Sequence, residues 1–169
     1  MAILKLQKSN LKTSVSKEEI KSDGFVTVVH NLELLKIMSK LEPQFIAKHK
    51  GDVVGYALSM HSSLSENVPV LQPMFYKMND LKYNGQVLQA KHYLTMGQVC
   101  VAKAYRGKNV FSNLYENMFN VMRSKYQFIV TEVSLNNTRS IRAHQKVGFE
   151  ELLNYKDETD HWSLIIKAL

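Results

Sequence analysis

The sequence contains a single cysteine, three prolines and seven glycines. No apolar run approaches the roughly 20 residues that a membrane-spanning helix needs. Because Cys100 has no second cysteine to pair with, a disulfide framework and zinc sites made of several cysteines are excluded. Residues 1–10 lack the apolar centre and cleavage site of a secretory signal peptide. These absences predict a soluble protein of the reducing cytoplasm.

Low-complexity segments, linkers and internal repeats are also absent. The 169 residues are 45% hydrophobic and 22% charged, which is ordinary for a soluble globular chain. This length suffices for one hydrophobic core but not comfortably for two. We therefore expect one domain spanning residues 1–169.

No long basic block occurs, although 22 Lys and Arg against 15 Asp and Glu give a net charge of +7. This balance suits an anionic ligand or a nucleic acid, but on charge alone a well-solvated surface is the favoured interpretation. Aromatic residues are not interleaved with a basic stripe, which disfavours nucleic-acid binding. No cluster of His and carboxylates has metal-ligand spacing, so we expect no metal.

The first half of the chain predicts helices followed by a hairpin. Residues 3–11 have helical periodicity, and Ser16 with Glu19 has the spacing of a capping box for a second helix that ends at Gly24. Asn31 can cap a third helix through about Lys40.

Two apolar runs flank the tight turn Lys50–Asp52 and predict antiparallel strands. Residues 61–91 are less regular, with a helix expected around Phe75 and Met78. This region is the expected variable wall of a binding site.

The second half alternates strands and helices. We expect, in order, a strand at 92–101, a helix at 108–123, a strand at 127–134, a helix at 137–146 and strands around Leu153 and Leu164. This order predicts a mixed α/β sheet with helices on its faces.

The segment VAKAYRGKNVFSNLYENM, residues 101–118, predicts a sharp turn from a strand into an amphipathic helix. The apolar face of that helix recurs at three- and four-residue steps, at Phe111, Leu114, Tyr115, Met118 and Met122. Its unpaired first-turn N–H groups favour an anion, and Arg106 and Lys108 add positive charge there. Taken alone, the pattern is also typical of a solvated basic turn.

The segment TEVSLNNTRSIRAHQKVGF, residues 131–149, places Glu132 inside an almost continuously apolar strand. A carboxylate there costs free energy unless it is paired, solvated or used, so Glu132 is either functional or a strand-end residue that reaches solvent. On the following helix, Asn137, Ser140 and His144 share one stripe. His144 alone is more simply a structural histidine.

Together these two segments resemble the GNAT superfamily of acetyl-CoA-dependent N-acetyltransferases. In that family an apolar strand end such as VCV precedes RxxGxG/A and a helix, and a later Asn is followed seven residues on by, usually, Tyr and then GF. Here Asn137, His144, Gly148 and Phe149 match the second motif in spacing. The resemblance covers roughly residues 24–169.

The chain departs from this pattern at both glycine positions of the first motif. Asn109 can keep the turn, because Asn tolerates a left-handed backbone. Phe111 lies on the apolar stripe of its helix, so we expect its side chain to turn toward the core and leave the backbone N–H groups accessible.

The resemblance implies the GNAT fold, a mixed and mostly antiparallel sheet of about six to seven strands flanked by helices. Since residues 1–10 already look helical, the family's first strand is expected to be missing. The resemblance also implies acetyl-CoA as cosubstrate, bound by the strand end, the loop with the first helical turn, and the second motif: Val99, Cys100, Val101, Arg106, Gly107, Lys108, Asn109, Val110, Phe111, Ser112, Asn137 and Ser140.

The implied reaction is direct attack of a neutral primary amine on the thioester. Glu132 occupies the position of the general base in some family members that acetylate protein N-termini, and His144 occupies that of the Tyr general acid. Backbone groups of Val99 and Val101 are expected to hold the pantetheine arm and polarise the thioester carbonyl. Cys100 is expected to be a core residue rather than a nucleophile.

The alternative reading is a non-catalytic GNAT-like domain that binds acyl-CoA, motivated by the replaced glycines. A small amine, a protein N-terminus and a lysine side chain all remain open as the acceptor. The oligomeric state carries no signature in the sequence, and a homodimer is compatible with it.

Overall fold

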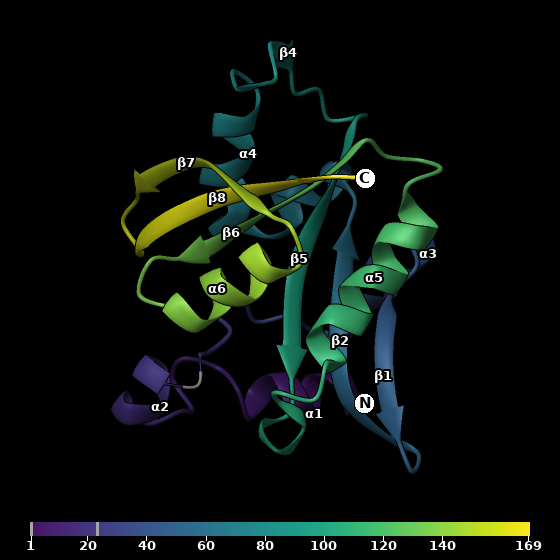
Figure 1. Cartoon of the computed structure of the whole chain (residues 1–169), viewed down its shortest axis with the longest axis vertical. Coiled ribbons are helices and arrows are strands. Elements are labelled where there is room, and N and C mark those ends of the chain that lie inside the picture. Colours follow the sequence, from purple (N-terminus) through teal and green to yellow (C-terminus); the bar gives the residue numbers. More distant parts are fainter. Residues whose placement is uncertain (1, 23) are drawn as a thin grey trace.

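The computed structural model describes residues 2–22 and 24–169 as one α/β domain (Figure 1). The helices are α1 Ala2–Lys8, α2 Lys17–Ser22, α3 Leu32–Leu41, α4 Gln72–Met78, α5 Val110–Met122 and α6 Thr138–Lys146. The strands are β1 Phe45–His49, β2 Asp52–Met60, β3 Lys82–Tyr83, β4 Gln86–Val87, β5 Tyr93–Val101, β6 Phe128–Ser134, β7 Glu150–Lys156 and β8 His161–Ala168. Short 3₁₀ helices cover Ser62–Asn67, Pro69–Leu71 and Lys103–Tyr105.

The main sheet has six strands in the order β1-β2-β5-β6-β8-β7, and β3 and β4 form a separate hairpin. Within the main sheet only β5 and β6 are parallel; the other neighbours are antiparallel. The prediction of a mixed, mostly antiparallel sheet is confirmed. Among the described residues, the main sheet has no strand before α3. That part of the chain contributes only α1, α2 and a single bridge between Leu11 and Val26.

The expected helix starts are present. The backbone N–H of Ser16 donates to the Glu19 carboxylate (3.0 Å), and that of Glu19 donates to Ser16 Oγ (3.2 Å), which completes the predicted capping box. Asn31 Oδ1 accepts from the backbone N–H of Leu34 (2.8 Å) and caps α3. These local contacts satisfy N–H groups that helix geometry leaves without partners.

Helices cover both faces of the sheet, and each face has its own hydrophobic core. One core contains Met38 of α3 and Met74 of α4, and the other contains Leu114 and Met118 of α5. In Figure 1, α5 and α6 lie in front of the sheet, with α3 and α4 behind it. The irregular region expected at 61–91 consists of short helices and the small β3–β4 hairpin.

Strands β5 and β6 separate after a short pairing. They pair only from Tyr93–Thr95 to Phe128–Val130, although both strands continue beyond that point. Farther on, β5 pairs with β2 and β6 pairs with β8. Thr131 Oγ1 donates to the Met96 carbonyl (2.9 Å) where the strands part. The sheet therefore opens between the carboxyl-terminal ends of its two parallel strands.

None of the helices in residues 2–22 and 24–169 is long and apolar enough to cross a bilayer.

The contact between Gly55 of β2 and α5 fixes where that helix begins. A Cβ at position 55 would lie 3.0 Å from Val110 Cγ1 and 3.2 Å from Leu114 Cδ1. We expect Gly55→Ala to lower the free energy of unfolding by about 1–3 kcal/mol through overpacking, measured by urea denaturation.

Val110→Ala provides the matched background, because it removes the nearest atom. In that background Gly55→Ala should cost clearly less. An equal cost in both backgrounds would show that the contact with Val110 is not the cause.

Candidate active site

The loop before α5 presents backbone N–H groups at a helix N-terminus. Gly107 (φ 73°) and Asn109 (φ 59°) both have left-handed backbones, which confirms the expectation for Asn109. A Cβ on Gly107 would meet nothing within 4 Å, so the loop surface is open there. Since α5 is 13 residues long, its first turn combines unpaired donors with a helix dipole and favours an anion.

Phe111, at the second replaced glycine, is half-buried. Its ring centroid lies 5.0 Å from that of Tyr115 and 5.1 Å from that of His144. The Phe111 side chain thus packs against the hydrophobic core around α5, as expected. Phe111 also lines a cleft at the start of this helix.

A cleft of about 360 Å³, the main cleft, opens at the end of β5. Its walls are the end of β5, the loop and first turn of α5, residues 24–26 and α6. Most of the residues assigned to the cofactor line it: Val99, Cys100, Val101, Arg106, Gly107, Asn109, Val110, Phe111, Ser112, Asn137 and Ser140. Asn10, from the turn after α1, also lines it.

The two cationic side chains expected to assist the diphosphate, Arg106 and Lys108, are engaged elsewhere in the structure. Lys108 is not part of the cleft lining, and its Nζ lies 5.4 Å from the centroid of the Tyr105 ring. Arg106 lines the cleft, but its guanidinium donates to the Val101 carbonyl (3.1 Å) and to Asn10 Oδ1 (2.6 Å). Arg106 therefore ties the loop to β5 and to the turn after α1.

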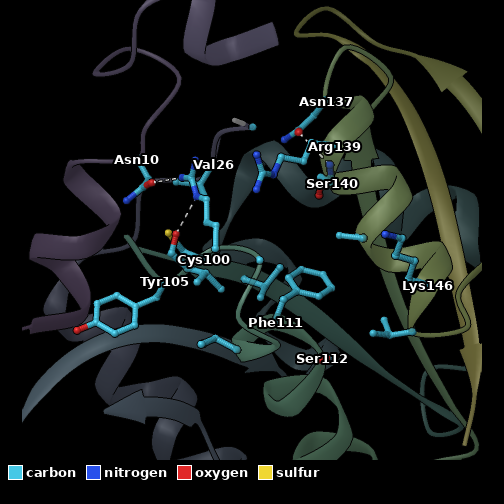
Figure 2. A pocket seen from close by; sticks show the side chains of 18 of the residues that line it. Asn10, Val26, Cys100, Tyr105, Phe111, Ser112, Asn137, Arg139, Ser140 and Lys146 are labelled. Atoms are coloured by element: carbon cyan, nitrogen blue, oxygen red, sulfur yellow. Dashed lines mark hydrogen bonds between the residues drawn. The ribbon is translucent and has the colours of Figure 1, made fainter. Parts of the chain in front are cut away.

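Two other basic residues, Arg139 and Lys146, line the main cleft from α6. Figure 2 shows them facing the cleft from the side opposite Phe111 and Ser112. They lie seven residues apart on one helix, so they share a face with Ala143 between them. The sequence already contained a signal for these two residues. Arg139 and Lys146 have the same seven-residue spacing as Asn137 and His144, and each follows its counterpart by two positions.

A smaller inner pocket of about 70 Å³ adjoins the main cleft and shares Phe25, Val26, Val99, Asn137 and Ser140 with it. Glu132, His144 and the α4 residue Met74 line the inner pocket. With Leu71 just before it, α4 thus supplies the wall expected from the 61–91 region. Glu132 is therefore next to the cleft rather than inside it.

Glu132 carries a raised pKa. Burial raises the pKa of its carboxyl to about 7, Asp157 contributes in the same direction, and a hydrogen bond from the Tyr155 hydroxyl to Oε2 opposes them. Such a carboxyl exchanges protons near neutrality, as a general base must. Tyr155, two strands away on β7, was not anticipated.

His144 does not have the properties of the expected general acid. Only 2% of it is exposed, and burial lowers the pKa of its imidazole to about 4. Nδ1–H donates to the Ser140 carbonyl (2.8 Å), so Nε2 must accept from the Tyr115 hydroxyl (2.6 Å). A neutral imidazole with both nitrogens bonded differs from the protonated ring that a general acid near neutrality requires, and the acid role of His144 stays a prediction.

Asn137 and Ser140 organise the start of α6. Asn137 Oδ1 accepts from the Ser140 N–H (3.2 Å), and its Nδ2 donates to the Phe25 carbonyl (3.0 Å). Asn137 thus caps the helix and joins it to residues 24–26 across the cleft. Cys100 is 6% exposed and belongs to the core, and burial raises the pKa of its thiol to about 11, as befits a structural residue.

The sequence matches the family model described as the acetyltransferase (GNAT) family over residues 16–149. The chain belongs to the GNAT acetyltransferase family. No curated protein sequence gives a significant match.

Solved structures of other GNAT proteins share the fold. The ribosomal-protein-alanine N-acetyltransferase of Brucella melitensis aligns over 99% of this chain and 93% of its own, with a TM-score of 0.62 and 18% identity. Ard1 of Thermoplasma volcanium aligns over 92% and 94%, with a TM-score of 0.62 and 16% identity. A NatB acetyltransferase complex solved with CoA and MES aligns over 85% and 86%, with a TM-score of 0.60 and 15% identity. At these identities the likeness concerns the fold.

The first motif found in the sequence forms the loop before α5 and the first turn of that helix, and the second motif spans α6 from its cap at Asn137 to Phe149. In the described part of the chain, no group of three or more His, Cys, Asp or Glu residues could hold a metal ion.

The state of His144 can be measured directly. We expect its ring to stay neutral, as the Nδ1–H tautomer, on acidification to about pH 5, because protonation would place an unsolvated charge in the core. Heteronuclear NMR of the ring nitrogens reports tautomer and charge. A His144 titration centred near 6.5 would contradict the buried, fully bonded imidazole.

Proposed function

We propose that this GNAT protein transfers the acetyl group of acetyl-CoA to a primary amine, with Glu132 as the general base. The observation that carries the proposal is the position of the Glu132 carboxyl, with its pKa near 7, in a pocket that shares walls with the main cleft. A non-catalytic binding domain has no use for a half-buried carboxyl with a raised pKa at that position.

The residues around the main cleft suit acetyl-CoA. The open first turn of α5 offers donors to a diphosphate, and Arg139 and Lys146 supply positive charge from the other wall. The stretch of β5 beyond Thr95 is not paired with β6, so its backbone can hold an extended amide-containing arm. Acetyl-CoA, when bound, supplies a thioester carbonyl as the electrophile.

Glu132 removes a proton from the attacking ammonium or amine. An alkylamine of pKa about 10.4 is less than 0.1% neutral at pH 7, so a base raises the reactive fraction. A C–N bond forms as the C–S bond breaks. The nitrogen of an ammonium loses two protons on becoming an amide N–H: one is released to solvent, and the other, taken up by Glu132, balances the thiolate, which leaves as coenzyme A thiol. Because burial lowers the pKa of His144 to about 4, this proposal assigns His144 no acid role in the step.

Substitutions of Glu132 and of its hydrogen-bond partner Tyr155 are expected to have different effects. Glu132→Gln should lower kcat for acetyl transfer by about 10²-fold or more, with acetyl-CoA binding retained. In the wild type, kcat/KM should rise with pH through about 7, because the base works when deprotonated. Both follow from thiol-release assays across pH, with calorimetry for binding.

Tyr155→Phe is the matched control. Removing its hydrogen bond, which lowers the Glu132 pKa, should move the acidic limb to higher pH. Full activity in Glu132→Gln would remove the base assignment. Acetyl-CoA binding without thiol release for any amine would instead favour the acyl-CoA-binding alternative.

The charges on α6 give an independent prediction. Arg139→Ala and Lys146→Ala should each weaken acetyl-CoA binding by about 5–10-fold at low salt, and less at high salt, because they act through partly screened charge. Arg142→Ala is the control, since Arg142 is exposed on the same helix but outside the cleft lining. Equal losses in all three variants would indicate a general effect of net charge.

A further inference from the structure

The inner pocket bears on which amine the enzyme accepts, an inference that rests on the proposed function. Along β6, Val130 belongs to the same core as α3 and α4, whereas Ile129 and Val133 belong to the core of α5. Side chains alternate along a strand, so Glu132 projects to the α3 and α4 side. The acceptor nitrogen is therefore expected to meet Glu132 from the face opposite α5.

Most polar side chains around the inner pocket already have partners within the chain. Gln98 Nε2 donates to the Val28 carbonyl (2.7 Å), and its Oε1 accepts from the Tyr56 hydroxyl (2.6 Å). Thr131 is bonded to the Met96 carbonyl and Ser134 Oγ to Asp160 (2.9 Å). Polar groups beside the reacting nitrogen of an acceptor would find few partners here, at a cost of about 1–3 kcal/mol each.

Thr95 and Trp162 are the exceptions. Both residues are buried and line the inner pocket, and neither Thr95 Oγ1 nor Trp162 Nε1 has a hydrogen-bond partner in the structure. The indole N–H can only donate, whereas the Thr95 hydroxyl oxygen can accept an N–H bond from an amine.

The charges around the inner pocket also limit which acceptors fit. Among the described lining residues Glu132 is the only acid, and neither Lys nor Arg is present. An acceptor with a carboxylate or phosphate next to its amine would bring a second negative charge beside Glu132 with no cation to offset it. Free α-amino acids fit this environment poorly.

The wall formed by residues 25–28, and the backbone that continues from it to His30, is held at several points. Besides the bonds from Asn137 to the Phe25 carbonyl and from Gln98 to the Val28 carbonyl, Val26 N–H donates to the Asn10 carbonyl (2.9 Å). The His30 N–H donates to Gln7 Oε1 (3.1 Å). With this wall fixed opposite Leu71 and Met74, the 70 Å³ space cannot widen cheaply for a branched group.

We propose that the inner pocket selects a primary amine on an unbranched, uncharged aliphatic stem, such as a lysine side chain or a free alkylamine. A slender methylene stem fills an apolar space and brings one nitrogen to Glu132 and Thr95. An amine on a branched carbon adds volume at the narrowest point, and an α-amine of a peptide also adds a carbonyl.

Isomeric amines test the shape directly. The full-length protein is assayed for thiol release from acetyl-CoA with n-butylamine and sec-butylamine, which have the same formula and differ in branching at the amine carbon. We expect kcat/KM to favour n-butylamine by about 10-fold or more. Nα-acetyl-lysine amide and an alanine-initiated peptide extend the comparison, with the lysine compound favoured.

Val28→Ala should raise the relative rate with sec-butylamine, because it widens the wall without touching the backbone carbonyl that Gln98 binds. Val68→Ala is the matched control, a buried valine outside both pocket linings, and should leave the ratio unchanged. The wild-type ratio needs no variant, so an unstable variant does not weaken the test.

The outcomes separate the two claims. If n-butylamine reacts faster than the lysine compound, the preferred acceptor is a free alkylamine. If the lysine compound reacts faster, the preferred acceptor is a lysine side chain of a polypeptide. Both results support selection of an unbranched amine. Equal or better turnover of sec-butylamine or of the alanine peptide overturns the inference alone. Absence of thiol release with every amine overturns the proposed function and the inference with it.

Discussion

The short pairing between β5 and β6 is the constraint on which the rest of the site depends. Three residue pairs join these parallel strands, and beyond Thr95 and Val130 each strand stays paired only with its other neighbour, β2 or β8. Backbone groups on the facing edges then lack sheet partners, and such groups need another partner. An extended amide-bearing arm can supply one, which explains why α5, α6 and residues 24–26 gather around this opening.

Two ionisable groups near the opening, the half-buried Glu132 and the buried His144, have opposite pKa shifts, and both shifts reduce charge in the folded protein. Because the pKa of Glu132 is raised to about 7, its contribution to stability is fully present below its unfolded pKa and is lost as pH rises through about 7. Because the pKa of His144 is lowered to about 4, its contribution is present above its unfolded pKa and is lost as pH falls toward 4. The carboxyl can exchange a proton near neutrality, while the imidazole is hydrogen-bonded to the Tyr115 hydroxyl and the Ser140 carbonyl.

Much of the fold was predictable because its signals are local. The cap at Asn31, the capping box at Ser16 and the left-handed backbone at Asn109 each depend on residues within a few positions. Glu132 was also recognisable, since an acid within an apolar strand is conspicuous. These features need no knowledge of the tertiary packing.

The missed features all depend on contacts between distant residues. Arg106 looked like an anion ligand, but its partner Asn10 is 96 residues away in the sequence, and no local pattern reveals that bond. Tyr155 reaches Glu132 across β8, so its role follows only from the strand order. His144 matched a motif in spacing, yet its burial beside Tyr115 decides its chemistry. Sequence spacing was enough to locate the candidate site residues, but their chemical properties depend on the tertiary packing around them.

The most direct measurement of the central claim is a crystal structure of the protein with coenzyme A. The account predicts diphosphate oxygens within hydrogen-bond distance of the first-turn N–H groups of α5, and a pantetheine arm between β5 and β6 with its sulfur directed toward the inner pocket. A coenzyme bound elsewhere, or a Phe111 ring occupying the diphosphate position, would contradict it.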